Sequence, residues 1–271
     1  MIYDIYLQSL PDYYITKENF NQSLKPEKAK TFFAYDKEKI VGFTLVHKNH
    51  LTLICVLPAY QRQKYGTKML KKAEEFILES GYSKINLGGG PASIFQGATI
   101  NSKPFFESFG YKANWTSVNM MLAIKDFSLK NVNIPAVETN ISFRLAKETD
   151  KIELLKAVND ADSSWLEIFK NCTEPVLLAI EDNKKIVGFE IFSNARFKQG
   201  YQKASALGCV GVIQSARQKG IGRRMVLEGI IRLKEQGVEA IELLYVALVD
   251  WYGRLGFKVV SEQWMAEKII K

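Results

Sequence analysis

The sequence predicts an α/β protein built from two similar domains in tandem. Two pairs of related segments support this prediction. A polar turn followed by Ile-Val-Gly-Phe occurs as DKEKIVGFTLV at 36–46 and again as DNKKIVGFEIF at 182–192. FFESFGY at 105–111 and WYGRLGF at 251–257 form a second pair with the same separation. Repeats of this length match whole domains rather than the short units of solenoid proteins.

The elements between these paired segments alternate between strands and helices. Each Ile-Val-Gly-Phe segment combines polar turn residues with alternating apolar positions, which is typical of a β-hairpin. An apolar strand, a basic turn and a long helix follow in both halves. Each helix keeps its apolar residues on one face, and we expect the helices to end at Gly81 and Gly237.

The domain boundaries are expected at a polar linker. Residues 126–139 contain a proline and show no apolar period, so we assign residues 1–125 to the first domain and 140–271 to the second. The second domain opens with a strand, and Thr149 is the expected N-cap of its first helix. The first domain has no counterpart of that strand, and its N-terminal segment is expected to be helical.

Composition limits the class of protein. The chain has 271 residues, of which 47% are apolar and 24% are charged. It is long enough for one large or two ordinary domains with hydrophobic cores, and its composition is not that of a disordered protein. No apolar run approaches the ~20 residues of a membrane span, and the N-terminus lacks the basic region of a secretory signal. The odd number of widely spaced cysteines indicates reduced thiols, so we expect a cytoplasmic protein without membrane contact. The cysteines are Cys55, Cys172 and Cys209.

Charge and histidine content exclude further classes. A net charge of +8 favours anionic partners. However, the chain has no basic stripe interleaved with aromatic residues, so nucleic acid is not an expected partner. His47 and His50 are the only histidines, so we expect no metal site and no Ser-His-Asp arrangement.

The basic turn of the second half has the chemistry of a phosphate site. An apolar strand runs into residues 213–222, IQSARQKGIG, and a helix starts at the glycines. Helix N-termini carry unpaired N–H groups and partial positive charge, and Gly220 and Gly222 would let an anion approach the backbone. The turn matches neither a Walker A loop nor a dinucleotide fingerprint. The surrounding basic residues are Arg217, Lys219, Arg223 and Arg224.

The order of these features resembles one family. An Arg-x-x-Gly-x-Gly turn between a strand and a helix, followed by a strand and then Tyr252 in Tyr-x-x-x-Gly-Phe, is similar to the GCN5-related N-acetyltransferases (GNAT). The resemblance covers residues 30–122 and 140–271. It implies two GNAT-type domains, each with a central mixed, largely antiparallel twisted sheet flanked by helices.

The resemblance also implies acetyl-coenzyme A as co-substrate, with no metal. In the family the turn holds the pyrophosphate, the preceding strand lines the pantetheine arm, and a backbone N–H of that strand polarises the thioester carbonyl. The expected cofactor-binding residues are Val210, Gly211, Val212, Arg217, Gln218, Lys219, Gly220, Ile221, Gly222 and Arg223.

Tyr252 is the expected general acid, because a phenol stays protonated at neutral pH and can donate a proton to the departing sulfur. Glu190, on the strand after Ile-Val-Gly-Phe, is assigned as the base, and Glu242 is the alternative, with Asp250 a weaker one. Cysteine acyl carriers are disfavoured, because buried strand cysteines without a nearby histidine are usually inert.

The two halves are not equivalent. In the first half QRQKYG keeps Gln61 and Gly66, but Lys64 replaces the first glycine and should crowd the pyrophosphate. Phe106 stands where the second half has Tyr252. We therefore expect a catalytic C-terminal domain and a degenerate N-terminal one. The glycine-rich segment 86–98 either shapes the acceptor pocket or is an irregular connection.

The expected function is acetyl-CoA-dependent transfer of an acetyl group, directly and without a protein nucleophile, to a primary amine of a small molecule or peptide. The alternative is a non-catalytic acetyl-CoA-binding sensor or interaction module. Either a monomer or a homodimer is compatible with the sequence, because the duplication can supply the packing that single-domain proteins obtain by dimerising.

Overall fold

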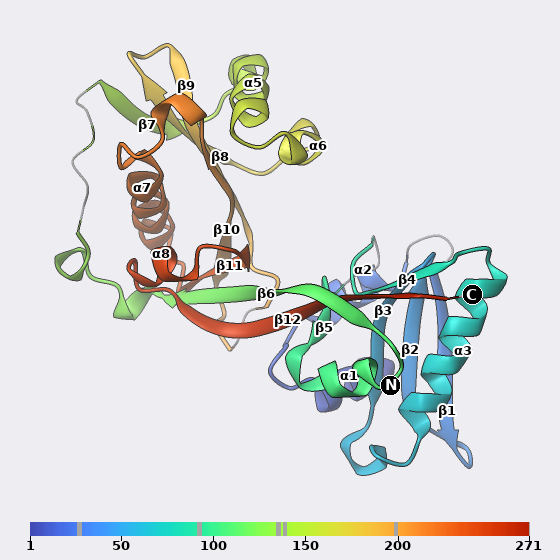
Figure 1. The fold of residues 1–271 in the computed structure, drawn as a ribbon. Helices are drawn as coiled ribbons and strands as arrows, with labels where there is room; N and C mark the ends of the chain where they lie inside the picture. The colour runs from blue at the N-terminus through green and yellow to red at the C-terminus, as the bar shows by residue number, and fades with distance from the viewer. Residues whose placement is uncertain (26–28, 91–93, 134–136, 138–139, 198–199, 271) are drawn as a thin grey trace. The chain divides into compact units, whose positions relative to one another are not determined.

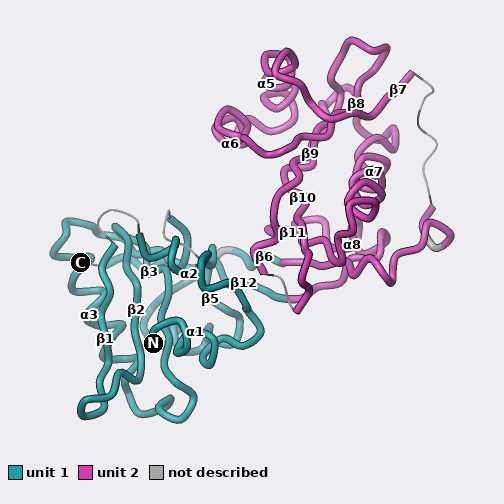
Figure 2. The backbone as a smooth tube through the Cα atoms, turned by 180° about the vertical axis from the view of Figure 1, so that it is seen from behind, with its two compact units in different colours: residues 1–118, 261–271 teal, residues 119–260 magenta. Residues whose placement is uncertain are grey.

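The strands of the chain form sheets with helices on their faces, as the computed structural model shows (Figure 1). The structure describes residues 1–25, 29–90, 94–133, 137, 140–197 and 200–270. These residues divide into two compact units (Figure 2). Unit 1 comprises residues 1–118 and 261–271, and unit 2 comprises residues 119–260.

Unit 1 has the strand order β1-β2-β3-β4-β12. The β1–β2, β2–β3 and β4–β12 pairs are antiparallel and the β3–β4 pair is parallel. The N-terminal segment is helical, as expected. The elements are α1 (Ile2–Ser9), α2 (Lys17–Ser23), β1 (Ala29–Asp36), β2 (Lys39–His47), β3 (His50–Val56), α3 (Tyr65–Glu79), β4 (Lys84–Leu87), β5 (Ala98–Thr99), α4 (Lys103–Glu107) and the first part of β6 (Lys112–Ala123).

Unit 2 has the order β6-β11-β10-β9-β8-β7, and only β10–β11 is parallel among the pairs with a described register. The predicted mixed, largely antiparallel α/β fold is confirmed. Strand β7 has no counterpart among the described residues of unit 1, also as expected. The elements are β7 (Ile141–Leu145), α5 (Lys151–Ala161), α6 (Leu166–Lys170), β8 (Val176–Glu181), β9 (Lys185–Asn194), β10 (Ala204–Val212), α7 (Ile221–Glu235), β11 (Ala240–Val246), α8 (Val249–Gly253) and β12 (Lys258–Ile269).

The Ile-Val-Gly-Phe repeat places helices on both faces of each sheet. In unit 2, a Cβ on Gly188 would lie 2.5 Å from the Met225 sulfur of α7, so Gly188 makes room for that helix. The next residue, Phe189, points to the other face and packs on Phe169 of α6, with ring centroids 4.9 Å apart. Figure 1 shows α7 and the α5–α6 pair on opposite sides of these strands. Unit 1 repeats this arrangement with Gly42 beside Met69 and Phe43 beside Phe20.

The last strand of the chain completes the sheet of unit 1. Residues Glu267, Lys268 and Ile269 of β12 pair antiparallel with β4. Trp264 is buried in the core that α3 forms with this sheet. The domain boundaries expected from the sequence differ from these units at two places. Residues 261–271 belong to unit 1 instead of the second domain, and residues 119–125 belong to unit 2 instead of the first. Of the expected linker, 134–136 and 138–139 lie outside the described residues.

The helix ends differ in how well the sequence predicted them. Gly81 and Gly237 follow α3 and α7 with φ of 86° and 75°, which confirms both predicted stops. Thr149 as N-cap is wrong. A 3₁₀ turn with Lys147 as its N-cap precedes α5, and the Asp150 carboxylate accepts the Lys147 N–H at 2.7 Å. No helix among the described residues is long and apolar enough to cross a membrane.

Candidate active site

Strands β10 and β11 separate along the sheet of unit 2. Their parallel ladder runs over Ala204–Ala206 and Ala240–Glu242, although both strands continue beyond it. Within these described strands, residues 207–212 of β10 therefore have no partner on the β11 side. An exposed strand edge of this kind can bond the amides of an extended ligand. The gap is where the resemblance predicts the pantetheine arm.

A β-bulge lies on β10 beside this gap. Gly208 pairs with Ile191 and Gly211 with Phe189, so two residues, Cys209 and Val210, face the single residue Glu190. Cys209 has a φ of 48°, which is unusual for a residue with a side chain. Bulges redirect backbone groups and are frequent next to active sites. The backbone of Cys209 and Val210 thus leaves the regular ladder, as a donor aimed at a carbonyl in the gap must do, and the pairing with β9 resumes at Gly211.

Gly211 has a packing reason to be glycine. A Cβ at this position would overlap the Phe189 ring, so the strand approaches the aromatic core closely. Val210 and Val212 are half-buried along the same edge. The burial of Cys209 raises the pKa of its thiol to about 11, with a smaller contribution from Cys172. A thiol of that pKa is a poor nucleophile, in agreement with the sequence-based preference against an acyl carrier.

Arg217 stabilises the turn itself. Its Nε donates to the Val212 carbonyl at 3.1 Å, and one terminal nitrogen donates to the Ala161 carbonyl at 2.9 Å. The turn is also fixed by Asp160, whose carboxylate accepts the Gln214 N–H at 2.7 Å. The guanidinium therefore connects the turn to the end of β10 and to α5. This geometry indicates a role in shaping the turn rather than a direct bond to phosphate.

Helix α7 starts without a capping side chain. Gly220 is its N-cap, with φ of 79°, and no side chain of the described residues bonds its first N–H groups at the cap. Gln218 is exposed and also left-handed, with φ of 65°. A Cβ on Gly222 would meet only Val212, at 3.4 Å, so the space over this helix end is open. These features fit the phosphate groups of coenzyme A.

The basic residues around the turn have different environments. Arg224 is paired with Glu228 at 2.7 Å along α7. Arg223 has an enclosed Nε that makes no hydrogen bond to any described residue. The Lys219 side chain is exposed. Ile221 is buried in the core, so only its backbone can contact a ligand.

Tyr252 lies on the short helix α8 and is mostly buried. Its ring packs edge-on against Trp251 and Phe257, with centroids 4.6 and 5.9 Å away. Burial raises the pKa of the Tyr252 phenol, and the Glu190 carboxylate raises it further. The hydroxyl is therefore a proton donor across the physiological range. Tyr252 and Glu190, the two residues assigned to catalysis, thus belong to α8 and β9 of the same unit.

Glu190 is fully buried under α7. A Cβ on Gly229 of that helix would overlap one carboxylate oxygen of Glu190, so the glycine makes room for the carboxyl group. Neither oxygen has a hydrogen-bond partner among the described residues. Burial raises the pKa of Glu190 well above its usual value, opposed by Arg232 and reinforced by Glu228. The Glu190 carboxyl group therefore lies on the α7 face of the sheet, with no described donor to hold its oxygens in place.

Gly229→Ala tests this packing through the repeat. Unit 1 has Thr44 and Ala73 at the corresponding positions, both buried. Alanine at 229 alone is expected to destabilise the protein by about 1–3 kcal/mol, because its Cβ overlaps Glu190. In a Glu190→Thr background the same change should instead stabilise by about 1 kcal/mol, since alanine favours the helix interior over glycine. Urea unfolding of the four proteins measures this reversal. Equal effects of Gly229→Ala in both backgrounds would refute the contact.

Glu242 occupies the end of the β10–β11 ladder, opposite Ala206. Its two carboxylate oxygens accept the backbone N–H groups of Arg196 and Phe197 at 2.6 and 3.1 Å. Burial raises the pKa of Glu242 to about 7, although these hydrogen bonds and the Arg196 charge oppose the rise. The sequence analysis left Glu242 as the alternative base.

The turn of unit 1 keeps the backbone of its counterpart. Arg62 and Lys64 have φ of 62° and 67°, like Gln218 and Gly220. Gln61 Nε2 donates to the Val56 carbonyl at 3.1 Å, as Arg217 does at the end of β10. A lysine in a left-handed conformation is less stable than a glycine there by roughly 1 kcal/mol. The backbone conformation of the turn is nevertheless the same in both units. The Lys64 side chain is exposed.

A cavity of about 780 Å³ lies in unit 1 along this turn. It is lined by β3 residues 51–56, by turn residues including Lys64 and Gly66, and by Phe106. Gly88 of the glycine-rich segment also lines it, and its carbonyl lies 2.8 Å from His50 Nδ1. Part of that segment, 91–93, lies outside the described residues.

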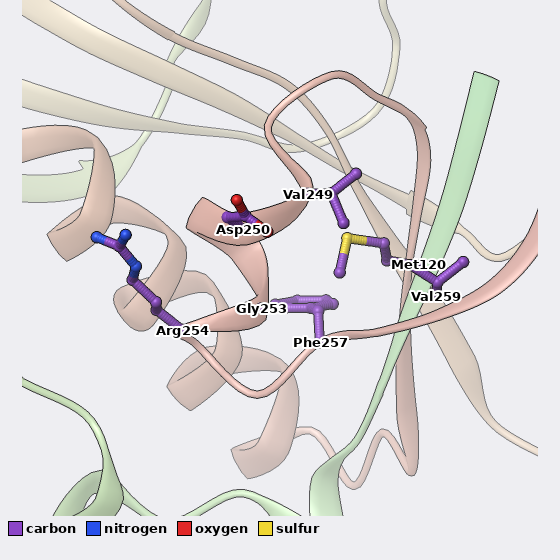
Figure 3. A pocket seen from close by; sticks show the side chains of 7 residues that line it. All are labelled: Met120, Val249, Asp250, Gly253, Arg254, Phe257 and Val259. Carbon is purple, nitrogen blue, oxygen red and sulfur yellow. The ribbon is translucent and has the colours of Figure 1, made fainter. Parts of the chain in front are cut away.

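Unit 2 has a cavity of about 470 Å³ away from its basic turn. Figure 3 shows the side chains of Met120, Val249 and Phe257 close together there, with Asp250 and Arg254 at the edge. Of the candidate site residues, Asp250 lines this cavity, and none of the lining residues belongs to the predicted cofactor turn. The apolar residues are Met120, Val249, Phe257 and Val259.

Sequence reasoning missed three features of the site. The bulge at Cys209, the space that Gly229 leaves for Glu190 and the bonds from Arg196 and Phe197 to Glu242 were not foreseen. Only Gly229 leaves a sequence signal, because glycine is unfavourable inside a helix.

Comparison with known proteins agrees with this architecture. A model of an acetyltransferase (GNAT) domain matches residues 7–120, and a model of the acetyltransferase (GNAT) family matches residues 146–257. The chain is 26% identical over 226 residues to a mycothiol acetyltransferase of Renibacterium salmoninarum. That match covers 75% of this chain and 63% of the relative, so this chain spans less than two thirds of the relative's length.

Two solved structures share the fold. A GCN5-related glucosamine N-acetyltransferase region of a fungal multi-domain GH3 β-N-acetylglucosaminidase has a TM-score of 0.79 at 22% identity, over 98% of this chain and 36% of that one. A tandem GNAT protein from the clavulanic acid biosynthesis pathway has a TM-score of 0.71 at 12% identity, over 98% and 93%. The chain therefore belongs to the GNAT acetyltransferase family and carries two of its domains in tandem.

Proposed function

We propose that this protein transfers an acetyl group from acetyl-CoA to a primary amine of a small molecule or peptide, and that unit 2 carries the reaction. One observation carries the proposal. The separated strands β10 and β11, the uncapped N-terminus of α7 and Tyr252 all belong to unit 2. A strand edge, an anion-binding helix end and a proton donor are what a thioester of coenzyme A requires.

Acetyl-CoA fits the binding elements of unit 2 segment by segment. The pyrophosphate would be held by the N–H groups that start α7 beside Gly222, with Arg223 and Lys219 supplying charge. The pantetheine arm would lie along residues 207–212, and the bulge would direct a backbone N–H at the thioester carbonyl. Arg217 would hold the turn in shape through Val212 and Ala161.

The names of similar proteins favour a small acceptor. The relative is a mycothiol acetyltransferase and one structural neighbour is a glucosamine N-acetyltransferase region. The first name indicates acetyl transfer, and the second specifies N-acetylation of an amino sugar. We therefore place amino sugars first among the acceptors to be tested, followed by amino acids, polyamines and peptides.

The test of this function measures thiol release from acetyl-CoA across that panel of amines. We expect amine-dependent release of free coenzyme A together with the N-acetylated product, identified by mass spectrometry. Binding of acetyl-CoA is measured separately by calorimetry. A protein that binds no acetyl-CoA, or releases no thiol with any amine, would contradict the proposal.

Matched variants in the two turns locate the productive site. Gly222→Asp places a side chain and a negative charge over the start of α7, so we expect it to abolish turnover and to weaken acetyl-CoA binding at least about tenfold. Arg217→Gln should bind nearly as well as the parent, because Gln61 makes the corresponding bond in unit 1. Gly66→Asp is the control in unit 1. Loss of turnover in Gly66→Asp but not in Gly222→Asp would assign the reaction to unit 1.

The cavity of unit 1 favours a binding role for that unit, in addition to the reaction in unit 2. Its volume and its turn suit a ligand of the coenzyme A type, but Phe106 has no hydroxyl to protonate a leaving sulfur. Unit 1 would then bind acetyl-CoA without transferring its acetyl group. A second binding event in the Gly222→Asp variant, lost on adding Gly66→Asp, is the expected calorimetric result.

A further inference from the structure

We propose that Glu242 is the general base that takes the proton of the acceptor amine, on the face of the unit 2 sheet opposite Tyr252. The inference rests on the proposed acetyl transfer and names the residue that makes the amine reactive. It also separates the acid and the base onto the two faces of one sheet.

The strand register places Glu242 at the start of the gap. Glu242 pairs with Ala206 in the last rung before β10 and β11 separate. A thioester lying between the separated strands would have its reacting carbon close to that rung. Glu242 is 1% exposed and its rung partner Ala206 is small, so an acceptor amine would approach the carboxylate from the gap, directly or through a water.

Alternation along the strands gives the face. Leu207 lies 3.3 Å from the Cβ position of Gly229, so it points towards α7, as Glu190 does. Ala206 precedes Leu207 and therefore points to the other face, and its rung partner Glu242 shares that face. The bonds from the loop after β9 to the Glu242 carboxylate agree with this placement. Tyr252 belongs to α8, which Figures 1 and 2 both show next to α7, so we place it on the α7 side of the sheet.

The Glu242 carboxylate is positioned by the backbone and has a suitable charge environment. The N–H groups of Arg196 and Phe197 fix its two oxygens at 2.6 and 3.1 Å, which leaves each oxygen able to accept another proton. The titratable groups that act on it are the Arg196 guanidinium and the Tyr245 phenol, and these two also interact with each other. Burial raises the pKa of Glu242 to about 7, the range in which a base is efficient at neutral pH.

The internal repeat supports the assignment. The corresponding rung of unit 1 pairs His50 with Asn86, which cannot accept a proton as a carboxylate does. Unit 1 also has Phe106 in place of Tyr252. The unit without the phenol hydroxyl thus also lacks the carboxylate, as expected if the two groups serve one reaction.

The proton and bond changes balance with these groups. The ammonium form of the acceptor gives one proton to the Glu242 carboxylate, directly or through a water. The neutral nitrogen then forms a bond to the acetyl carbonyl carbon, the carbon–sulfur bond breaks, and the nitrogen, which is positively charged after the attack, releases its second proton to solvent to give the amide. The departing sulfur takes a proton from Tyr252, and the proton on Glu242 returns to solvent, from which the phenol is restored. The net products are the acetylated amine, free coenzyme A and one proton.

The test is the pH profile of kcat, at saturating acetyl-CoA and amine, for the wild-type protein and three variants. Wild-type kcat should fall as pH decreases through about 7, because protonation removes the base. Glu242→Gln should lower kcat at neutral pH by about 100-fold and remove this acidic limb, with unchanged acetyl-CoA affinity. Arg196→Gln should move the limb to higher pH, because the positive charge that lowers the Glu242 pKa is gone.

Glu239→Gln is the matched control. The Glu239 carboxylate accepts the N–H groups of Gln202 and Lys203 at 2.8 and 3.0 Å, at the other end of the loop that follows β9. Glu239 precedes the β10–β11 ladder and so does not face the gap. It should keep the wild-type rate and limb. If Glu242→Gln keeps the wild-type pH profile, or if the acidic limb of Arg196→Gln does not move, the assignment of Glu242 is wrong but the proposed function stands. Absence of transfer by the wild-type protein to every amine overturns the proposed function and this assignment with it.

Discussion

Tyr252→Phe is expected to lower kcat by about 100-fold or more, because the thiolate would leave without a proton donor. The fold should tolerate the change, since the chain already contains the phenylalanine version. The Phe106 and Tyr111 rings of unit 1 lie 5.4 Å apart at 72°, close to the 5.9 Å and 79° of Tyr252 and Phe257. The measurement is steady-state turnover together with acetyl-CoA affinity.

The affinity for acetyl-CoA separates this role from packing. A hydroxyl that acts on the departing sulfur affects turnover and leaves binding within about twofold. Phe106→Tyr in unit 1 is the control and should change neither quantity, since Asn86 stands at the rung that corresponds to Glu242. Tyr252→Phe with the parent kcat would exclude the phenol from the reaction.

Trp264→Ala is expected to destabilise unit 1 by about 3–5 kcal/mol. The indole is 4% exposed and packs in the core formed by α3, β4 and α4. The Lys103 ammonium lies 5.8 Å from its ring centroid. Because Trp264 belongs to the last strand of the chain, its removal should weaken a unit that is otherwise formed mainly by residues 1–118. Urea unfolding monitored by circular dichroism measures the loss.

Val259→Ala is the control for Trp264, on the same strand but within unit 2. Its side chain is 46% exposed, so truncation should cost less than about 1 kcal/mol. If residues 261–269 contributed little to unit 1, the two variants would unfold at similar urea concentrations. Such a result would refute the role of β12 in completing this sheet.

The pattern of the chain was sufficient to predict most of the local structure. The repeated Ile-Val-Gly-Phe segments, the amphipathic helices and their glycine stops depend on periodicity and on single-residue conformational preferences. The structure confirms the predicted mixed α/β architecture and the two helix ends. The predicted N-cap of α5, Thr149, was wrong. The Asp150 carboxylate instead pairs with Arg144 and accepts the Lys147 N–H, and the pairing depends on a partner from β7.

The sequence could not distinguish the environments of the two carboxylates considered for the base. Glu190 and Glu242 both lie on strands of the second half. Both are glutamates, so the sequence predicts the same acid–base chemistry for each. Only packing distinguishes them, because Glu190 faces Gly229 of α7 while Glu242 faces the loop after β9. Side-chain direction depends on strand register, and register is a long-range property.

The sequence alone determined that this is a duplicated α/β protein whose second half has the intact Arg-x-x-Gly-x-Gly turn and the tyrosine. Those features are local, because glycine conformations, helix starts and residue order are properties of short segments. The tertiary structure decided that Arg217 shapes the turn, that β10 bulges opposite Glu190 and that β12 belongs to unit 1. Each of these depends on partners distant in the chain, and a contact between distant residues is selected by the packing of the whole unit rather than by either segment.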